Sequence, residues 1–240
     1  MNVTTSIDAL PEGMRTPVRE FAEVLRSLAE DNALALTFYG AIAAGAFDPE
    51  RHSARSVLVV KKIELSLLRR IAEHGPRFGK NRIAAPLIMT PAYIHDSLDT
   101  FPLEFLEIQQ NHVVLFGDDH FAELTLAESD VRYQCERELK VLAISLRQGL
   151  LAAAGRDKVL ADIGTGIGEG LLRTVRGMLW LKGRRDAQSG TLVVAELENL
   201  TSRRFAGLRQ ALSGSAATGW EAFEQLYGDI VALAEIVDAW

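Results

Sequence analysis

The sequence predicts an α+β protein, in which an N-terminal α/β domain with a small mixed sheet precedes an all-α helical bundle. Two observations carry this prediction. Short apolar runs rich in β-branched residues recur in the first half, whereas apolar residues at intervals of three and four fill the second half. The period changes near residue 128, and such a change is typical of two differently built domains. We therefore expect an α/β domain over residues 1–125 and a bundle over residues 126–240.

In the first half, helix and strand signals alternate. Thr16 and Pro17 supply an N-cap and a proline at the first helical position, so a helix is expected over about residues 17–30. A second helix is expected from Ile63 to Ile71, with a stop at Gly75-Pro76. Strands are expected over residues 33–39, 55–60, 86–90 and 103–116, the last interrupted near residues 110–111.

In the second half, apolar stripes predict a long helix from Ser129 to Leu150 and a final helix over residues 220–240. Residues 157–183 and 191–212 are helical in pattern, with a loop at Ser213-Gly214-Ser215. Cys135 lies on the apolar stripe of the long helix, so we expect it to be buried in the bundle core.

Composition excludes several classes of protein. The net charge of −6 disfavours a protein whose main role is nonspecific binding of nucleic acid. A single cysteine excludes a disulfide framework, and the five histidines contain no His-x-x-x-His pair typical of zinc sites. No apolar run reaches the ~18 residues of a membrane span, and the N-terminus lacks the features of a signal peptide. We expect a cytoplasmic protein.

The segment between the first two expected strands carries the most informative motif. Tyr39-Gly40 ends the first strand, Gly45 follows, and Ser53-Ala54-Arg55-Ser56 leads into the second strand. This arrangement resembles the nucleotidyltransferase superfamily (the DNA-polymerase-β-like fold), in which a strand ends in Gly-Ser, a second glycine follows and the next strand carries Asp-x-Asp. The resemblance covers residues 15–118, and a C-terminal helical bundle is common among smaller bacterial members.

The sequence departs from this family at the metal-binding positions. Ala41 stands at the family's serine, whereas Ala54 and Ser56 stand at its two aspartates. The next expected strand, residues 85–89, has no acid where the family has its third carboxylate. Because Mg²⁺ is held by anionic oxygens, the resemblance implies a catalytically inactive member with no catalytic residue and no metal ligand of its own.

Any surviving ligand site is expected over the glycine turn. The expected ligand-binding residues are Gly40, Ala41, Gly45, Ser53 and Ser56, with Lys61 nearby. Arg55 points to the opposite face of a regular strand from its neighbours and ranks below the two serines. The ligand is expected to be a nucleotide or a protein partner, and a homo-oligomer stays open.

Two alternatives remain open. An active nucleotidyltransferase would need relocated acids, for which Asp118, Asp119 and Glu104 are the candidates, and Mg²⁺ would then be its cofactor. Glu104 and Glu107 are expected on opposite faces of a strand. Residues 159–168, with Gly164, Gly166 and Gly168, also resemble the first motif of S-adenosylmethionine-dependent methyltransferases, with residues 192–196 as a second strand. The competing interpretation of the glycines is a helix packed closely against a neighbour.

Overall fold

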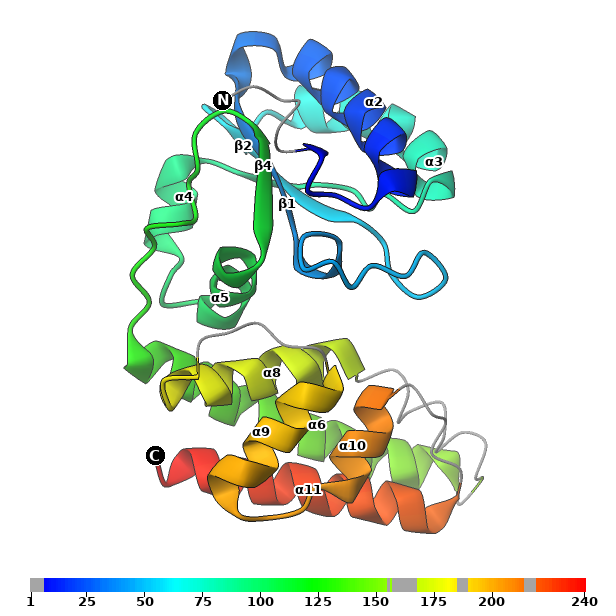
Figure 1. Ribbon diagram of the computed structural model, residues 1–240, viewed down its shortest axis with the longest axis vertical. Helices are drawn as coiled ribbons and strands as arrows, with labels where there is room; N and C mark the ends of the chain where they lie inside the picture. The colour runs from blue at the N-terminus through cyan, green and yellow to red at the C-terminus, as the bar shows by residue number, and fades with distance from the viewer. Residues whose placement is uncertain (1–6, 155, 157–167, 185–189, 214–218) are drawn as a thin grey trace. The chain divides into compact units, whose positions relative to one another are not determined.

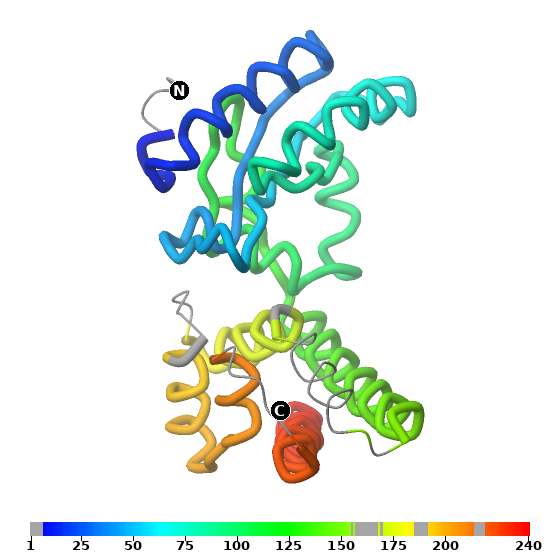
Figure 2. Tube along the Cα trace, turned by 90° about the vertical axis from the view of Figure 1, so that its right-hand side faces the viewer, coloured from blue at the N-terminus to red at the C-terminus, as the bar shows by residue number. Residues whose placement is uncertain are grey.

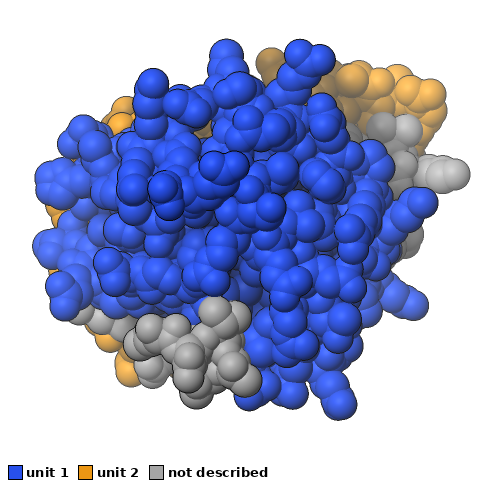
Figure 3. Space-filling model, turned by 90° about the horizontal axis from the view of Figure 1, so that it is seen from above, with its two compact units in different colours: residues 1–98, 105–125 blue, residues 99–104, 126–240 orange. Residues whose placement is uncertain are grey.

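The computed structural model describes residues 7–154, 156, 168–184, 190–213 and 219–240 (Figures 1 and 2). The chain divides into two compact units (Figure 3). Unit 1 comprises residues 1–98 and 105–125, and unit 2 comprises residues 99–104 and 126–240. In the described residues, no helix combines the length and the apolar character that crossing a membrane requires.

Unit 1 is built around four strands. These are β1 (Ala33–Tyr39), β2 (Arg55–Val60), β3 (Leu87–Met89) and β4 (His112–Phe116), and they pair in the order β3-β2-β1-β4. The β1 strand pairs antiparallel with β2 and β4, whereas β2 and β3 are parallel, so the sheet is mixed as expected. Its helices are α2 (Glu12–Ala29), α3 (Leu65–Lys80) and α4 (Pro91–Asp96), with short 3₁₀ turns η1 (Glu30–Asn32) and η2 (Gly40–Ile42).

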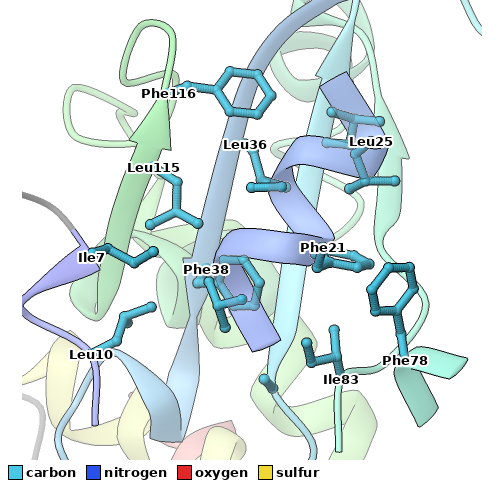
Figure 4. Close-up of a cluster of buried hydrophobic side chains, with 14 of the residues drawn as sticks. Ile7, Leu10, Phe21, Leu25, Leu36, Phe38, Phe78, Ile83, Leu115 and Phe116 are labelled. Carbon is cyan, nitrogen blue, oxygen red and sulfur yellow. The ribbon is translucent and has the colours of Figure 1, made fainter. Parts of the chain in front are cut away.

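One face of the sheet packs against α2 and α3 through a continuous apolar core (Figure 4). Phe21 of α2 lies at its centre, with its ring edge-to-face on Phe38 of β1 (5.9 Å between centroids) and on Phe78 of α3 (4.9 Å). Leu36 and Leu58 lie in the same core from β1 and β2. Leu36 and Phe38 of β1 and Leu58 and Val60 of β2 therefore face α2 and α3.

Three expectations about local structure are wrong. Thr16-Pro17 does not begin the first helix, because α2 begins at Glu12 with Pro11 at its N-cap and Pro17 in its interior. The α3 helix runs through Gly75-Pro76 to Lys80, because the buried Phe78 packs on Phe21 and holds the last turn in place. Tertiary packing here outweighs the helix-breaking tendency of proline.

Residues 102–110, expected as a strand, form helix α5 (Pro102–Gln110). Pro102 stands at its first position, where a proline has no hydrogen bond to lose. Glu104 and Glu107, three residues apart, consequently lie on neighbouring positions of one helix face rather than on opposite faces of a strand. The expected interruption near residues 110–111 is where α5 ends and β4 begins.

Unit 2 is the helical bundle that the sequence predicts. It contains α6 (Glu128–Ala153), α8 (Gly168–Leu181), α9 (Gly190–Thr201), α10 (Ala206–Ser213) and α11 (Trp220–Asp238). Cys135 of α6 is fully buried, as expected, and its Sγ lies 3.5 Å from the Thr174 carbonyl oxygen of α8. Burial raises the pKa of the Cys135 thiol to about 12, with a smaller contribution from Glu138, so the thiol stays protonated and unreactive at neutral pH.

Candidate functional site

The glycine turn after β1 has a backbone that favours glycine. Gly40 adopts φ +76°, in the left-handed region, and its carbonyl oxygen accepts hydrogen bonds from the N–H groups of Ala43 (3.0 Å) and Ala44 (2.9 Å). The Gly40 N–H donates to the Asn111 carbonyl oxygen (3.0 Å), which ties the turn to the start of β4. A Cβ at Gly40 would lie 2.7 Å from Nη2 of Arg55. The missing side chain thus leaves room for a guanidinium above the turn.

Arg55 fills that room. Its guanidinium lies over the ring of Tyr39, 4.9 Å from the centroid, and forms a two-pronged ion pair with Glu107 of α5. Nη2 donates to Oε1 at 2.5 Å and Nη1 donates to Oε2 at 3.4 Å. The Glu107 side chain is 11% exposed and that of Arg55 34%. We call Gly40, Arg55 and Glu107 the sheet-end cluster.

The direction of Arg55 follows from the strand pairing. Residues directly opposite one another in an antiparallel pair share a face of the sheet, and Arg55 is opposite Tyr39 while Ser56 is opposite Phe38. Because Phe38 packs against α2, Ser56 faces that core, where it is 1% exposed. Its Oγ has no hydrogen-bond partner within the described residues. Ala54 is equally buried in the same core. The geometry therefore places Arg55, and not Ser56, at the turn. The expected order of these residues in ligand binding stays a prediction.

The other expected site residues lie around the turn with different exposure. Ala41 is half-buried, whereas Gly45, at φ +70°, and Ser53 are exposed. Lys61 follows the far end of β2, where its N–H donates to the Asn32 carbonyl oxygen (2.9 Å). The expectation that Lys61 lies near the turn is wrong, because the whole length of the strand separates it from Gly40.

The side chains at the turn do not fit the metal pair that the family resemblance implies. Ala54 has no donor atom, the Ser56 hydroxyl faces the core, and Arg55 brings a cation. A divalent ion needs anionic oxygens, and the one carboxylate of the sheet-end cluster is paired with a guanidinium. Over the described part of the chain, no three His, Cys, Asp or Glu residues group as metal ligands.

Two of the three acids proposed as relocated ligands, Asp119 and Glu104, have structural partners of their own, whereas Asp118 is exposed. Asp119 accepts hydrogen bonds from the N–H groups of Phe121 (2.9 Å) and Ala122 (3.1 Å), and its Oδ2 lies 2.9 Å from Nε2 of His112. Burial alone would raise the pKa of Asp119, but these contacts hold it below its ordinary value. In unit 2, Glu104 pairs with Arg173 (3.2 Å).

The methyltransferase motif lies mostly outside the described residues. Of residues 159–168, only Gly168 is described, and it begins α8. Residues 192–196, which that alternative requires as a strand, lie within the helix α9. Residues 192–196 therefore do not form the second strand that the methyltransferase alternative requires.

Sequence reasoning did not find Glu107 as a site residue. It assigned residues 103–110 to a strand, although Pro102 followed by acids three residues apart is a helix signal. Its contact with Arg55 joins residues 52 positions apart, which no local pattern indicates.

The comparisons with known proteins bear on the fold. No family model matches the sequence, and no curated protein matches it either. Among solved structures, the chain is similar to spectinomycin adenyltransferase AAD(9) from Enterococcus faecialis, solved with ATP and spectinomycin. The two share 11% sequence identity with a TM-score of 0.57, over 93% of this chain and 98% of that chain. This likeness, together with the mixed sheet and the helical C-terminal part, shows that the chain has a nucleotidyltransferase-like fold.

Proposed function

We propose that this chain is a nucleotidyltransferase-like protein that binds a nucleotide at the Gly40 turn without a metal ion and does not transfer it. The observation that carries the proposal is the sheet-end cluster. Arg55 occupies the end of β2, where a metal-dependent enzyme of this fold would need anionic oxygens. A guanidinium instead binds phosphate oxygens directly, and its planar fork suits two of them at once.

Glu107 would act as the resting partner of Arg55. Its carboxylate neutralises the guanidinium when no ligand is bound, and a phosphate group presenting a similar pair of oxygens can take its place. The N–H groups and small side chains of the turn, including Ala41, Gly45 and Ser53, would surround the bound group. Ser56 is left out of this proposal, because its hydroxyl faces the α2 core.

Metal dependence distinguishes this proposal from an active nucleotidyltransferase. An active enzyme binds the Mg²⁺ complex of a nucleoside triphosphate, whereas a cationic site without metal ligands prefers the more negative uncomplexed nucleotide. ATP is the first ligand to test, because the similar adenyltransferase was solved with it. CTP and GTP complete the panel.

The test is a thermal-shift and calorimetric titration of the whole protein with each triphosphate, in EDTA and in excess Mg²⁺. We expect binding in EDTA that Mg²⁺ weakens. A nucleotide at 100 times its dissociation constant should stabilise the fold by about 2.7 kcal/mol. Stabilisation that appears only with Mg²⁺, or any transfer of a nucleotidyl group to an acceptor, would overturn the proposal and favour relocated acids.

Three variants locate the site. Arg55→Ala should weaken nucleotide binding at least tenfold, since it removes a charge-assisted contact. Glu107→Gln should strengthen binding, because it removes the competing carboxylate. Ser56→Ala is the matched control on the opposite face of the same strand, and it should leave the dissociation constant unchanged. Equal losses in Arg55→Ala and Ser56→Ala would mean that the turn is not the site.

A further inference from the structure

A polar cavity lies in unit 2, between α9 and the start of α10. These two helices lie side by side (Figures 1 and 2). Its volume is about 460 Å³, within the range of pockets that hold small ligands. Its lining consists of Ala195, Glu198, Asn199, Ser202, Arg203, Arg204 and Arg209. Three of these seven residues are arginines, in a chain whose net charge is −6.

Glu198 organises this cavity. Its side chain is 9% exposed, and Oε1 accepts a hydrogen bond from the Phe205 N–H (3.0 Å). Oε2 accepts from Nη2 of Arg209 at 2.5 Å and lies 3.8 Å from Nη1 of Arg204. Both carboxylate oxygens are thus committed to holding the α9–α10 connection and positioning two guanidinium groups.

The cavity carries an excess of positive charge. Glu198 is the one acid in its lining, against the guanidinium groups of Arg203, Arg204 and Arg209. Arg203 lies over the ring of Phe205 (5.7 Å), and within the described part of the chain no carboxylate is within ion-pair distance of it. Asp229 of α11 interacts electrostatically with Arg203, but it does not line the cavity. Its carboxylate accepts a hydrogen bond from the Leu208 N–H (3.0 Å). We call Glu198, Arg203, Arg204 and Arg209 the bundle cluster.

We propose that the bundle cluster binds the phosphate group of a small phosphorylated molecule. Guanidinium groups bind phosphate through paired N–H donors, and Asn199 and Ser202 add neutral polar groups beside them. The proposed phosphate site does not depend on free N–H groups at the N-terminus of α10. The N–H groups of Phe205 and Leu208 there already donate to the carboxylates of Glu198 and Asp229. The cavity volume of about 460 Å³ and the negative net charge of the chain favour a small ligand over a polynucleotide.

The experiment uses the whole protein and two probes, inorganic phosphate and phenyl phosphate, with binding measured by calorimetry at fixed ionic strength. The test variant is Arg203→Ala/Arg204→Ala, since both side chains are exposed and neither anchors the fold. The matched control is Arg19→Ala/Arg69→Ala, which removes the same charge from exposed positions in unit 1. Thermal unfolding of each variant verifies that it is folded.

We expect wild type and the Arg19/Arg69 control to bind both probes alike, and the Arg203/Arg204 variant to bind at least tenfold more weakly. Absence of binding to wild type would overturn the proposal. Equal weakening in both double variants would overturn it too, because the effect would then reflect net charge alone. A single-stranded RNA oligonucleotide serves as a third probe. If it binds more tightly than phenyl phosphate and loses affinity in the Arg203/Arg204 variant, the cavity is part of a polynucleotide surface instead.

Discussion

The sheet-end cluster and the bundle cluster use the same chemistry in different proportions. At the sheet end, one guanidinium forms an ion pair with one carboxylate. In the bundle, one carboxylate holds two guanidinium groups and a third lies beside them. The difference between the clusters lies in their ratio of cations to acids rather than in the presence of an arginine. If both clusters bind phosphate as we propose, the sheet-end cluster has to release Glu107 from Arg55 first, whereas the bundle cluster has more guanidinium groups than carboxylates before any ligand binds.

The glycine of the sheet-end cluster and the glycine next to the bundle cluster also differ in the atoms that surround them. A Cβ at Gly40 would meet the flexible end of Arg55, but a Cβ at Gly207, next to the bundle cluster, would lie 2.4 Å from the Leu226 backbone nitrogen. We expect Gly207→Ala to have the largest effect on stability, lowering the free energy of unfolding by about 3 kcal/mol or more, because α10 must move away from α11. Urea unfolding measures this.

Gly228→Ala is the control for that substitution. Gly228 lies in the middle of α11, and no atom is within 4 Å of an added Cβ. Alanine there should raise the free energy of unfolding by about 0.5–1 kcal/mol through helix propensity. A loss at Gly228 as large as that at Gly207 would contradict the close approach of α10 to α11.

Removing the two carboxylates compares the clusters directly. Glu198→Ala leaves the Phe205 N–H and two guanidinium groups without their acceptor, so we expect a loss of about 2–3 kcal/mol. Glu107→Ala leaves one guanidinium, itself 34% exposed, and should cost about 1–2 kcal/mol. Denaturant unfolding of both variants, with Glu→Gln at each position as the isosteric control, tests the order. A larger loss at Glu107 would mean that the single pair, not the shared carboxylate, is the stronger structural contact.

The smallest expected effect is the pH dependence of the contribution that Glu198 makes to the free energy of unfolding. Burial alone would raise the pKa of Glu198, but the Phe205 N–H and Arg209 hold it below its ordinary value of 4.5. Its contribution to stability is therefore fully present above about pH 4.5 and is lost as the pH falls through the lowered pKa. The difference in unfolding free energy between wild type and Glu198→Gln should shrink on acidification below pH 4.5.

Asp229 should behave in the opposite way. Burial raises the pKa of its carboxyl above the ordinary value of 3.8, so the folded state holds the proton more firmly than the unfolded chain. Stability relative to Asp229→Asn should improve, not decline, as the pH falls through the raised pKa. Thermal unfolding between pH 3 and pH 7 compares the two variants, and slopes of the same sign would contradict these assignments.

Local patterns predicted the parts of this fold that depend on neighbouring residues. Short apolar runs at residues 33–39 and 55–60, the second with β-branched residues, predicted β1 and β2, and Gly40 predicted the turn between them. The periodic stripes of the second half predicted the bundle helices. Where two signals conflicted, as in the apolar run after Pro102, the prediction failed, because a short apolar run fits a buried strand and a buried helix equally well.

By itself, the sequence determined the fold class, the glycine turn and the residue types that stand beside that turn, because these follow from residue type and from spacing along the chain. Only the tertiary structure decided which side of β2 faces the turn, that Glu107 is the partner of Arg55, and that Arg204 and Arg209 share Glu198. The physical reason is that the spacing of apolar residues reflects the local secondary structure of each segment and which of its faces is apolar. The pairing of charges 52 residues apart depends on the packing of whole elements, which no local window contains.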